Sequence, residues 1–387
     1  MLSALAVYGV VVLLVVVFTP HLTFNDGFGD LDGRAYAAMV AQLRGGLPVD
    51  LPPEYVYRIL PVELVAHSRI DPLTGFLVLN LTGLTVAAIL LYALLRAYGI
   101  SSTVAIIGVA WWAVLPAGIR LSWYYPYLVD GVGYGFLTAL LYLAVKGRFA
   151  LFAIVLPFAL LTRENLVTLI PFLWLVNARR IGLLRSGALT SAVALPGMVA
   201  FELVRLFPVI APAKPADTLG DIRQNFEWFR TNTAERSWRF EAAPFLTLGI
   251  IPAVVIARAR AVARFLRSEL AWVYYVLSTL VLAIIGGGDY DRFDLWLAPA
   301  VLVMALRSAP LFRWWPAIWI LLTSLHLLAA RFLVPLAPGA EGYRTYVVAL
   351  MPMDQVVAAL ARCLLTGILA WMLLTLTPQA PRASTAP

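Results

Sequence analysis

The chain has 387 residues, of which 62% are hydrophobic and only 13% are charged. A water-soluble domain of this length needs more polar surface, so these proportions indicate a protein that crosses a membrane several times. The single cysteine, Cys363, excludes an internal disulfide and a cysteine metal cluster. The three histidines (His21, His67, His326) stand far apart in no metal-ligand spacing, so we expect each to be packed or interfacial.

Apolar runs along the chain define the fold class as an all-α polytopic membrane protein. Residues 1–378 are expected to form a single domain, followed by a disordered cytoplasmic tail at 379–387. The first run is interpreted as a retained helix, because it lacks a charged start and a small-residue cleavage site. About twelve transmembrane helices are predicted, at 2–19, 74–95, 103–119, 128–145, 149–162, 165–178, 187–210, 243–257, 269–287, 294–306, 314–334 and 355–376.

The distribution of charge predicts the orientation of these helices. With a cytoplasmic N-terminus, the inside loops contain one acid, Glu269, and thirteen basic residues: Arg96, Lys146, Arg148, Arg179, Arg180, Arg185, Arg258, Arg260, Arg264, Arg267, Arg307, Arg313 and Arg382. Such a bias is typical of cytoplasmic loops. We therefore expect both termini in the cytoplasm of a cell membrane, such as a bacterial inner membrane. The net charge of +8 is then an orientation signal and gives no reason to expect nucleic acid.

The first outer loop, residues 20–73, begins with three carboxylates, Asp26, Asp30 and Asp32. The segment that follows, "GRAYAAMVAQLRGG", has apolar residues at helical spacing and is expected to be an amphipathic helix on the outer leaflet. One acid can serve as the N-cap of that helix, but capping a surface helix does not require the other two acids. We therefore expect at least one of these acids to be catalytic.

Further along, Arg58 lies on the outer side against the charge bias, so it requires an anionic partner, either a loop acid or a ligand phosphate. The segment "RLSWYYPYLVDG" (120–131) is interpreted mainly as an aromatic belt at the headgroup level. Gly131 and Gly135 have the spacing of close helix packing. The outer loop 211–242 is expected to be a second amphipathic segment, in which Glu227, Arg230 and Arg236 form a solvated face.

Two outer turns carry charges beside helices that are too short for a membrane core of about 30 Å. The turn "TREN" contains Arg163 and Glu164, and "DYDRFDLWLAP" contains Asp289, Asp291, Arg292 and Asp294. Charges below the membrane surface are costly unless they are paired or face a wet cavity, so they are candidate functional residues. The structural alternatives are an Arg163–Glu164 ion pair with Thr162 as a helix cap, and Asp294 as the N-cap of the later helix.

The segments "DLDGRAY", "YRILP", "TREN" and "DYDRFDLWLAP", in this order over residues 30–299, resemble the GT-C superfamily of multi-pass glycosyltransferases that use lipid-phosphate sugar donors. The resemblance implies short helices around an outward-facing cavity, with surface amphipathic helices and a first-loop carboxylate as base. That base is Asp32, with Asp30 as the alternate. We expect no soluble C-terminal domain of the kind that larger members have, and this expectation favours a lipid-linked or glycan acceptor.

The expected reaction is inverting transfer from a polyprenyl-phosphate sugar on the extracytoplasmic face. A base near the acceptor hydroxyl and cations at the departing phosphate suffice for it. Arg58, Arg163 and Arg292 are the candidate cations, with Glu164 and Asp291 also assigned to substrate binding. No cofactor is expected to be obligatory, although the Asp30/Asp32 and Asp289/Asp291 pairs can hold Mg²⁺ or Mn²⁺.

Two alternatives stay open. One is a polysaccharide polymerase or ligase that acts on lipid-diphosphate glycans, against which the acidic first loop counts. The other is a transporter or flippase without chemistry, which should show two related halves with broken helices and charges near the membrane midplane. Expected partners are the sugar donor, the acceptor and membrane lipids.

Overall fold

The computed structural model describes residues 1–20, 32–48, 51–210, 218–231, 233–285, 290–308, 315–348 and 350–376, and every regular element in these ranges is a helix. Asp26, Asp30, Asp289, His21 and the predicted tail 379–387 lie outside the described residues. The N-terminal part of the chain contains α1 (Leu2–Phe18), α2 (Asp32–Leu43), α3 (Pro53–Val56), α4 (Ile59–Ser68), α5 (Pro72–Ala97), α6 (Ser102–Ala113), η3 (Pro116–Arg120), α7 (Leu121–Tyr124), α8 (Asp130–Lys146), α9 (Phe149–Leu160) and η4 (Glu164–Thr168).

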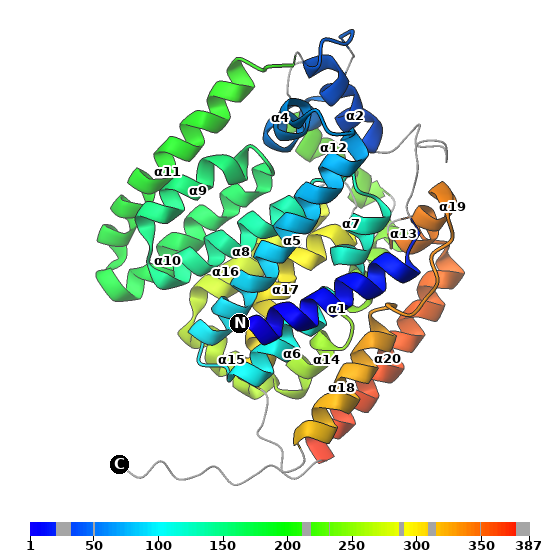
Figure 1. Ribbon diagram of the computed structural model, residues 1–387. Coiled ribbons are helices and arrows are strands. Elements are labelled where there is room, and N and C mark those ends of the chain that lie inside the picture. Colours follow the sequence, from blue (N-terminus) through cyan, green and yellow to red (C-terminus); the bar gives the residue numbers. More distant parts are fainter. Residues whose placement is uncertain are drawn as a thin grey trace.

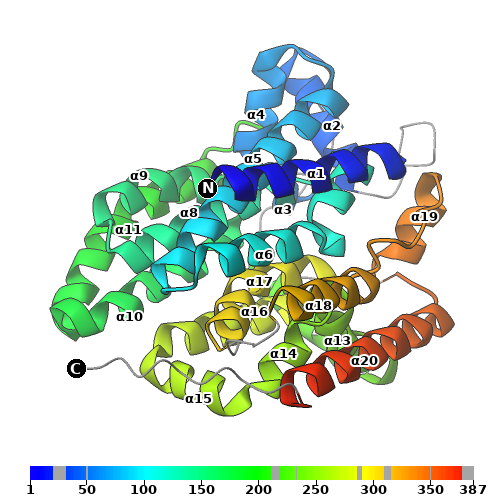
Figure 2. The same ribbon diagram turned by 60° about the horizontal axis from the view of Figure 1, so that its bottom comes forward.

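The C-terminal part continues in the same all-helical way. Its elements are α10 (Leu169–Ile181), α11 (Leu183–Leu206), α12 (Thr218–Thr231), α13 (Thr233–Leu248), α14 (Ile251–Ala257), α15 (Ala259–Ser268), α16 (Leu270–Ile285), α17 (Tyr290–Arg307), α18 (Trp315–Ala329), α19 (Gly339–Tyr346) and α20 (Met353–Leu376). Helices α9, α10 and α11 lie together on one side of the bundle, and α18 and α20 lie on the opposite side (Figure 1). The turned view in Figure 2 shows the same grouping, with α2 and α4 together at one end.

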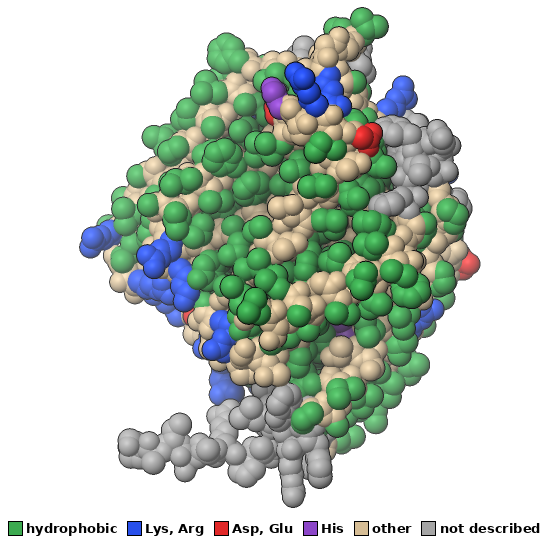
Figure 3. Space-filling model, viewed as in Figure 1, with side chains coloured by type: hydrophobic (Ala, Val, Ile, Leu, Met, Phe, Trp, Pro, Cys, Tyr) green, Lys and Arg blue, Asp and Glu red, His purple; other side chains and the backbone are tan. Residues whose placement is uncertain are grey.

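Several helices are apolar and long enough to cross a membrane. Within the described residues, α5, α11 and α20 each qualify alone by length and composition, and counting each of three bent pairs as one span gives up to six candidate spans. Helices α9 and α10 have only 12 and 13 residues, which agrees with the short runs expected from the sequence. The surface seen in Figure 3 is largely hydrophobic, as expected for a membrane-embedded protein. The count of twelve spans and the depth of each helix stay predictions.

Some predicted helices have other boundaries in the structure. The run predicted as one helix at 103–119 is broken, because Pro116 disfavours helical backbone at the residue before it; α6 ends at Ala113 and η3 follows at an angle of 45°. The helix predicted at 243–257 is two helices bent by 94° after Leu248. The structural alternative in which Asp294 is the N-cap of a helix is wrong, because α17 begins at Tyr290 and places Asp294 in its interior.

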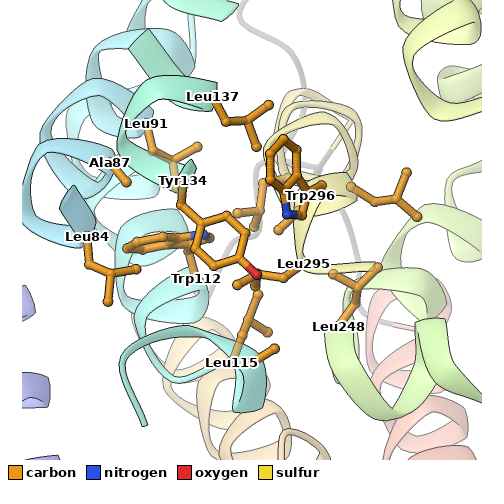
Figure 4. Close-up of a cluster of buried hydrophobic side chains, with 14 of the residues drawn as sticks. Leu84, Ala87, Leu91, Trp112, Leu115, Tyr134, Leu137, Leu248, Leu295 and Trp296 are labelled. Carbon is orange, nitrogen blue, oxygen red and sulfur yellow. The ribbon is translucent and has the colours of Figure 1, made fainter. Parts of the chain in front are cut away.

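The core is built on the contact between α5 and α8, the most extensive in the fold. These helices approach closely because glycines face each other: a Cβ added to Gly135 would lie 2.8 Å from the carbonyl oxygen of Gly83. The packing role predicted for Gly131 and Gly135 is therefore confirmed, since a Cβ on Gly83 would also overlap the backbone of Gly131. Buried side chains of α5, α8 and α17 meet around Tyr134 and Trp296 (Figure 4). Helix α17 is buried on nearly all sides, so it is the central helix of the bundle.

Candidate functional site: a buried network of arginines and carboxylates

Asp32 lies at the start of α2, a helix that packs against α3 and α4. Its Oδ1 accepts a hydrogen bond of 2.9 Å from the Tyr55 hydroxyl. Its Oδ2 lies 3.2 Å from Nη1 of Arg292, although 260 positions separate the two residues in the sequence. The carboxylate keeps 25% of its side chain exposed, so it is held by protein groups on one side and remains accessible on the other.

Helix α2 is anchored beside Asp32 by its own buried face. Gly33 presents its backbone N–H to the Tyr125 hydroxyl, and a Cβ at Gly33 would lie 2.8 Å from that same oxygen. Tyr36, one turn later, is fully buried and packs edge-on against Tyr55 with ring centroids 5.5 Å apart. The amphipathic helix predicted here is therefore present, and its apolar face packs against the protein.

Asp130 connects two arginines that come from distant parts of the chain. Its Oδ2 accepts a hydrogen bond of 2.8 Å from Nε of Arg292 and lies 2.7 Å from Nη2 of the same guanidinium, and its Oδ1 accepts a hydrogen bond from Nη2 of Arg163. The three side chains are only 4–7% exposed. Such paired, charge-assisted bonds fix a guanidinium in one orientation. Arg292 is thereby aligned so that its remaining Nη1 reaches Asp32.

The position of Asp130 follows from the loop that precedes α8. The side-chain amide of Asn80 in α5 donates to the carbonyl oxygens of Pro126 and Leu128, at 2.6 and 2.5 Å. This fixes the last turn before α8, which places Asp130 in the first turn of that helix. On the other side, the Tyr134 hydroxyl donates to the Arg292 carbonyl oxygen at 3.1 Å, which ties α8 to α17.

A second ion pair completes the network. Arg58 donates from Nε and Nη2 to the two carboxylate oxygens of Glu164, at 3.0 and 2.7 Å, and from Nη1 to the Tyr36 hydroxyl at 3.3 Å. The anionic partner predicted for Arg58 is thus a loop acid. Glu164 keeps 39% of its side chain exposed. The alternative Arg163–Glu164 pair is wrong, and Thr162 bonds the Phe158 carbonyl oxygen in place of capping a helix.

The electrostatic environment keeps both accessible carboxylates ionised. Burial alone would raise the pKa of Asp32, but the charge of Arg292 and the Tyr55 hydrogen bond outweigh it and hold that pKa below its usual value. Burial likewise opposes ionisation of Glu164, and the charge and hydrogen bonds of Arg58 lower its pKa to about 2. Burial raises the pKa of Tyr55, and the neighbouring Asp32 raises it further, so Tyr55 remains a hydrogen-bond donor.

Asp291 faces a different part of the fold. Its Oδ2 accepts a hydrogen bond of 3.3 Å from the backbone N–H of Val348, beyond α19. It therefore helps to hold the α19 region against α17, while its neighbour Arg292 reaches Asp32 and Asp130. Of the residues predicted for substrate binding, Arg58, Arg163, Glu164 and Arg292 belong to the network around Asp32, and Asp291 makes its described contact elsewhere. The alternate base, Asp30, lies outside the described residues.

Asp130 is the residue that the sequence interpretation missed. The segment around it was assigned to an aromatic belt, but Tyr124, Tyr125 and Tyr127 are fully buried, so that assignment is wrong. Charge balance gave no signal for Asp130, because the motifs that contain Arg58, Arg163 and Arg292 already offer more acids than arginines.

Metal-ligating side chains do not gather anywhere in the described part of the chain, where no group of three His, Cys, Asp or Glu residues is found. Both acid pairs considered for Mg²⁺ or Mn²⁺ include a residue outside that part. His326 is buried and its Nε2 lies 3.0 Å from the Trp111 carbonyl oxygen, as expected for a packed histidine. Neither a protein-family model nor a curated protein matches this chain.

Proposed function

We propose that this protein is an inverting membrane glycosyltransferase that moves a sugar from a polyprenyl-phosphate donor to a lipid-linked or glycan acceptor. The observation that carries the proposal is the accessible Asp32 carboxylate, held ionised by Arg292 at the edge of a buried arginine–carboxylate network. A general base must be unprotonated and within reach of the acceptor hydroxyl, and Asp32 meets the first requirement while its exposed side leaves room for the second.

In the proposed reaction, Asp32 takes the proton of the acceptor hydroxyl. The acceptor oxygen bonds to the anomeric carbon as the bond from that carbon to the donor phosphate oxygen breaks, so the anomeric configuration inverts. The electron pair of the broken bond stays on the phosphate, which leaves as a polyprenyl monophosphate with one more negative charge than the donor carried.

The charge balance of the network suits that step. Arg58, Arg163 and Arg292 face the carboxylates Asp32, Asp130 and Glu164, so the described charges balance before reaction. Once Asp32 is protonated, one positive charge is in excess, and Nη1 of Arg292 no longer faces an anion. This excess develops as the phosphate gains its negative charge, which is the moment at which electrostatic stabilisation accelerates a reaction.

A lipid-linked donor also needs an apolar approach to the site. Helix α9 leads directly to Arg163, and its exposed side chains include Leu151, Ile154 and Phe158, at 51%, 61% and 49% exposure. An isoprenoid chain along this face would bring its phosphate toward the turn that carries Arg163 and Glu164. In the proposed orientation the site faces the extracytoplasmic side, where polyprenyl-phosphate sugars rather than nucleotide sugars are the donors.

The test uses purified protein in lipid vesicles with a panel of radiolabelled polyprenyl-phosphate sugars and a membrane lipid extract as acceptor source. The proposal predicts loss of label from one donor and its appearance in a new glycolipid or glycan of inverted configuration. Arg292→Lys keeps the charge but cannot make the same set of bonds to Asp130 and Asp32, and should reduce transfer strongly. Arg307→Lys, an exposed position on the same helix, is the matched control and should keep wild-type transfer.

The result that contradicts the proposal is movement of an intact donor across the vesicle membrane without transfer. That outcome would favour a transporter or flippase. Transfer from a nucleotide sugar in place of the lipid-phosphate donors would also overturn the donor assignment.

A further inference from the structure

A second charged feature lies on α15, which precedes a sharp bend in the chain. The axis of α15 is turned by 105° from α16, a helix that forms a candidate membrane span together with it. Arg260, Arg264 and Arg267 are all exposed and are spaced four and three residues apart. At 3.6 residues per turn this spacing places the three arginines on one stripe of the helix.

The opposite face of α15 is buried in the protein. Val262 and Phe265 are 5% and 6% exposed. The Phe265 ring packs edge-on against Tyr98 with centroids 5.8 Å apart, and the Arg307 guanidinium lies 5.2 Å from the centre of the same ring. The apolar stripe therefore fixes the rotation of α15 about its axis and directs the arginine stripe away from the bundle.

Helix α10 extends this charged surface. Arg179, at its C-terminal end, donates to the carbonyl oxygens of Ser268 and Arg267 and so ties the ends of α10 and α15 together. Arg180 is exposed next to it. We call Arg179, Arg180, Arg260, Arg264 and Arg267 the α15 basic face. In Figure 3, Lys and Arg side chains gather on this lower-left part of the molecule, beside a broad hydrophobic surface.

We propose that the α15 basic face binds the headgroups of anionic phospholipids. Helix α15 lies at 105° to the apolar helix α16, so its exposed arginines stand at the headgroup level if α16 crosses the membrane. Its arginines then stand where lipid phosphates lie, and a guanidinium matches a phosphate with paired donors. A soluble polyanion would contact only the arginines, whereas a phospholipid contacts both the arginines and the apolar surface that continues along α10 and α16. This inference is independent of the proposed transferase activity.

The test titrates the detergent-solubilised full chain with mixed micelles that contain phosphatidylglycerol, phosphatidylcholine or neither, with free glycerol phosphate as a further arm. Binding is followed by native mass spectrometry and by the melting temperature. Each basic residue near an anionic surface contributes about fivefold to affinity, so three of them contribute about 100-fold. The expected loss of phosphatidylglycerol binding is therefore about 100-fold in the triple variant Arg260→Gln/Arg264→Gln/Arg267→Gln. Arg260→Lys/Arg264→Lys/Arg267→Lys keeps the charges and should retain most of the binding, which also controls for folding.

The matched control removes three exposed arginines elsewhere, Arg69→Gln/Arg223→Gln/Arg344→Gln, and should leave phosphatidylglycerol binding unchanged. Equal loss of binding in both glutamine triples would show that only net charge matters and would overturn the proposal. Binding of phosphatidylcholine as tight as that of phosphatidylglycerol would also overturn it. So would saturation by free glycerol phosphate at the same concentration, because the surface would then be a soluble-phosphate site.

Discussion

Asp130→Asn should destabilise the protein more than any other single change in the network. The substitution keeps the size of the side chain but removes the charge shared by Arg163 and Arg292. The new amide also has an NH₂ group that faces the N–H groups of one guanidinium. Both groups are hydrogen-bond donors, so the NH₂ cannot accept a bond from that guanidinium. Two buried arginines, each 7% exposed, are then left beside each other without their common anion.

The expected cost follows from this geometry. Removing one partner of a buried ion pair costs about 3–5 kcal/mol, because the remaining charge is desolvated and uncompensated. Arg163→Met should cost less, since Asp130 keeps both bonds from Arg292 and loses one bond to a charged group, about 1.5–3 kcal/mol. In Asp130→Asn/Arg163→Met the only arginine that has lost the Asp130 charge is Arg292, which still contacts Asp32. The double variant should therefore be no less stable than Asp130→Asn alone, so the two costs are not additive.

The assay is equilibrium unfolding by SDS titration in mixed micelles, followed by tryptophan fluorescence. Asp71→Asn is the matched control, because Asp71 is exposed and caps α5 with a bond of 3.1 Å to the Thr74 N–H that an asparagine can also accept. A change of less than about 0.5 kcal/mol for Asp130→Asn would refute the reasoning, because it would show that Asp130 is not the shared counterion. Strict additivity in the double variant would refute it as well.

Three further predictions follow from the same structure. The stabilisation from Glu164 is measured as the difference in unfolding free energy between wild type and Glu164→Gln. It should be complete above pH 4.5, where the carboxyl of the unfolded chain is ionised. It should be lost as the pH falls toward 2, the lowered pKa of Glu164 in the folded state. Gly83→Ala should lower the free energy of unfolding in SDS by about 1–3 kcal/mol through overpacking, whereas Gly9→Ala, which meets no atom within 4 Å, should be neutral or slightly stabilising. In a cysteine-free background, an impermeant reagent applied from outside should label a cysteine at exposed Leu47 but not one at Arg264, and the reverse pattern would contradict the proposed orientation.

The presence of charge pairing could be predicted from the sequence, but the choice of partners could not. Arg163 has extended backbone, with φ −151° and ψ 111°, and successive side chains of an extended chain point in opposite directions. Arg163 and Glu164 therefore reach different partners, Asp130 and Arg58, although they are adjacent in the sequence. Asp130 lies in α8 and Arg58 lies directly before α4, so only the tertiary fold determines these partners.

The helical fold class could be predicted because the apolar composition and the length of the apolar runs directly indicate membrane-spanning helices. The break before Pro116 was also available as a signal, since proline restricts the residue that precedes it. The burial of α17 could not be predicted from the sequence, because an apolar helix in contact with lipid and one in contact with other helices have similar composition. For the same reason, the aromatic residues beside Asp130 could be placed at a membrane surface or in the core with equal ease, and the core is where they lie.

The initial rate of sugar transfer by Asp32→Asn, compared with Asp71→Asn, tests the central claim most directly. Asparagine keeps the shape of the side chain and can still accept from Tyr55 or Arg292, but it cannot take a proton. Asp32→Asn should elute as a folded, monodisperse protein and should bind the polyprenyl-phosphate donor. Its rate of sugar transfer should be lower than that of the wild type by about 10²–10⁴-fold, the usual loss when a general base is removed. Turnover by Asp32→Asn close to that of Asp71→Asn would contradict the account and remove Asp32 from the mechanism.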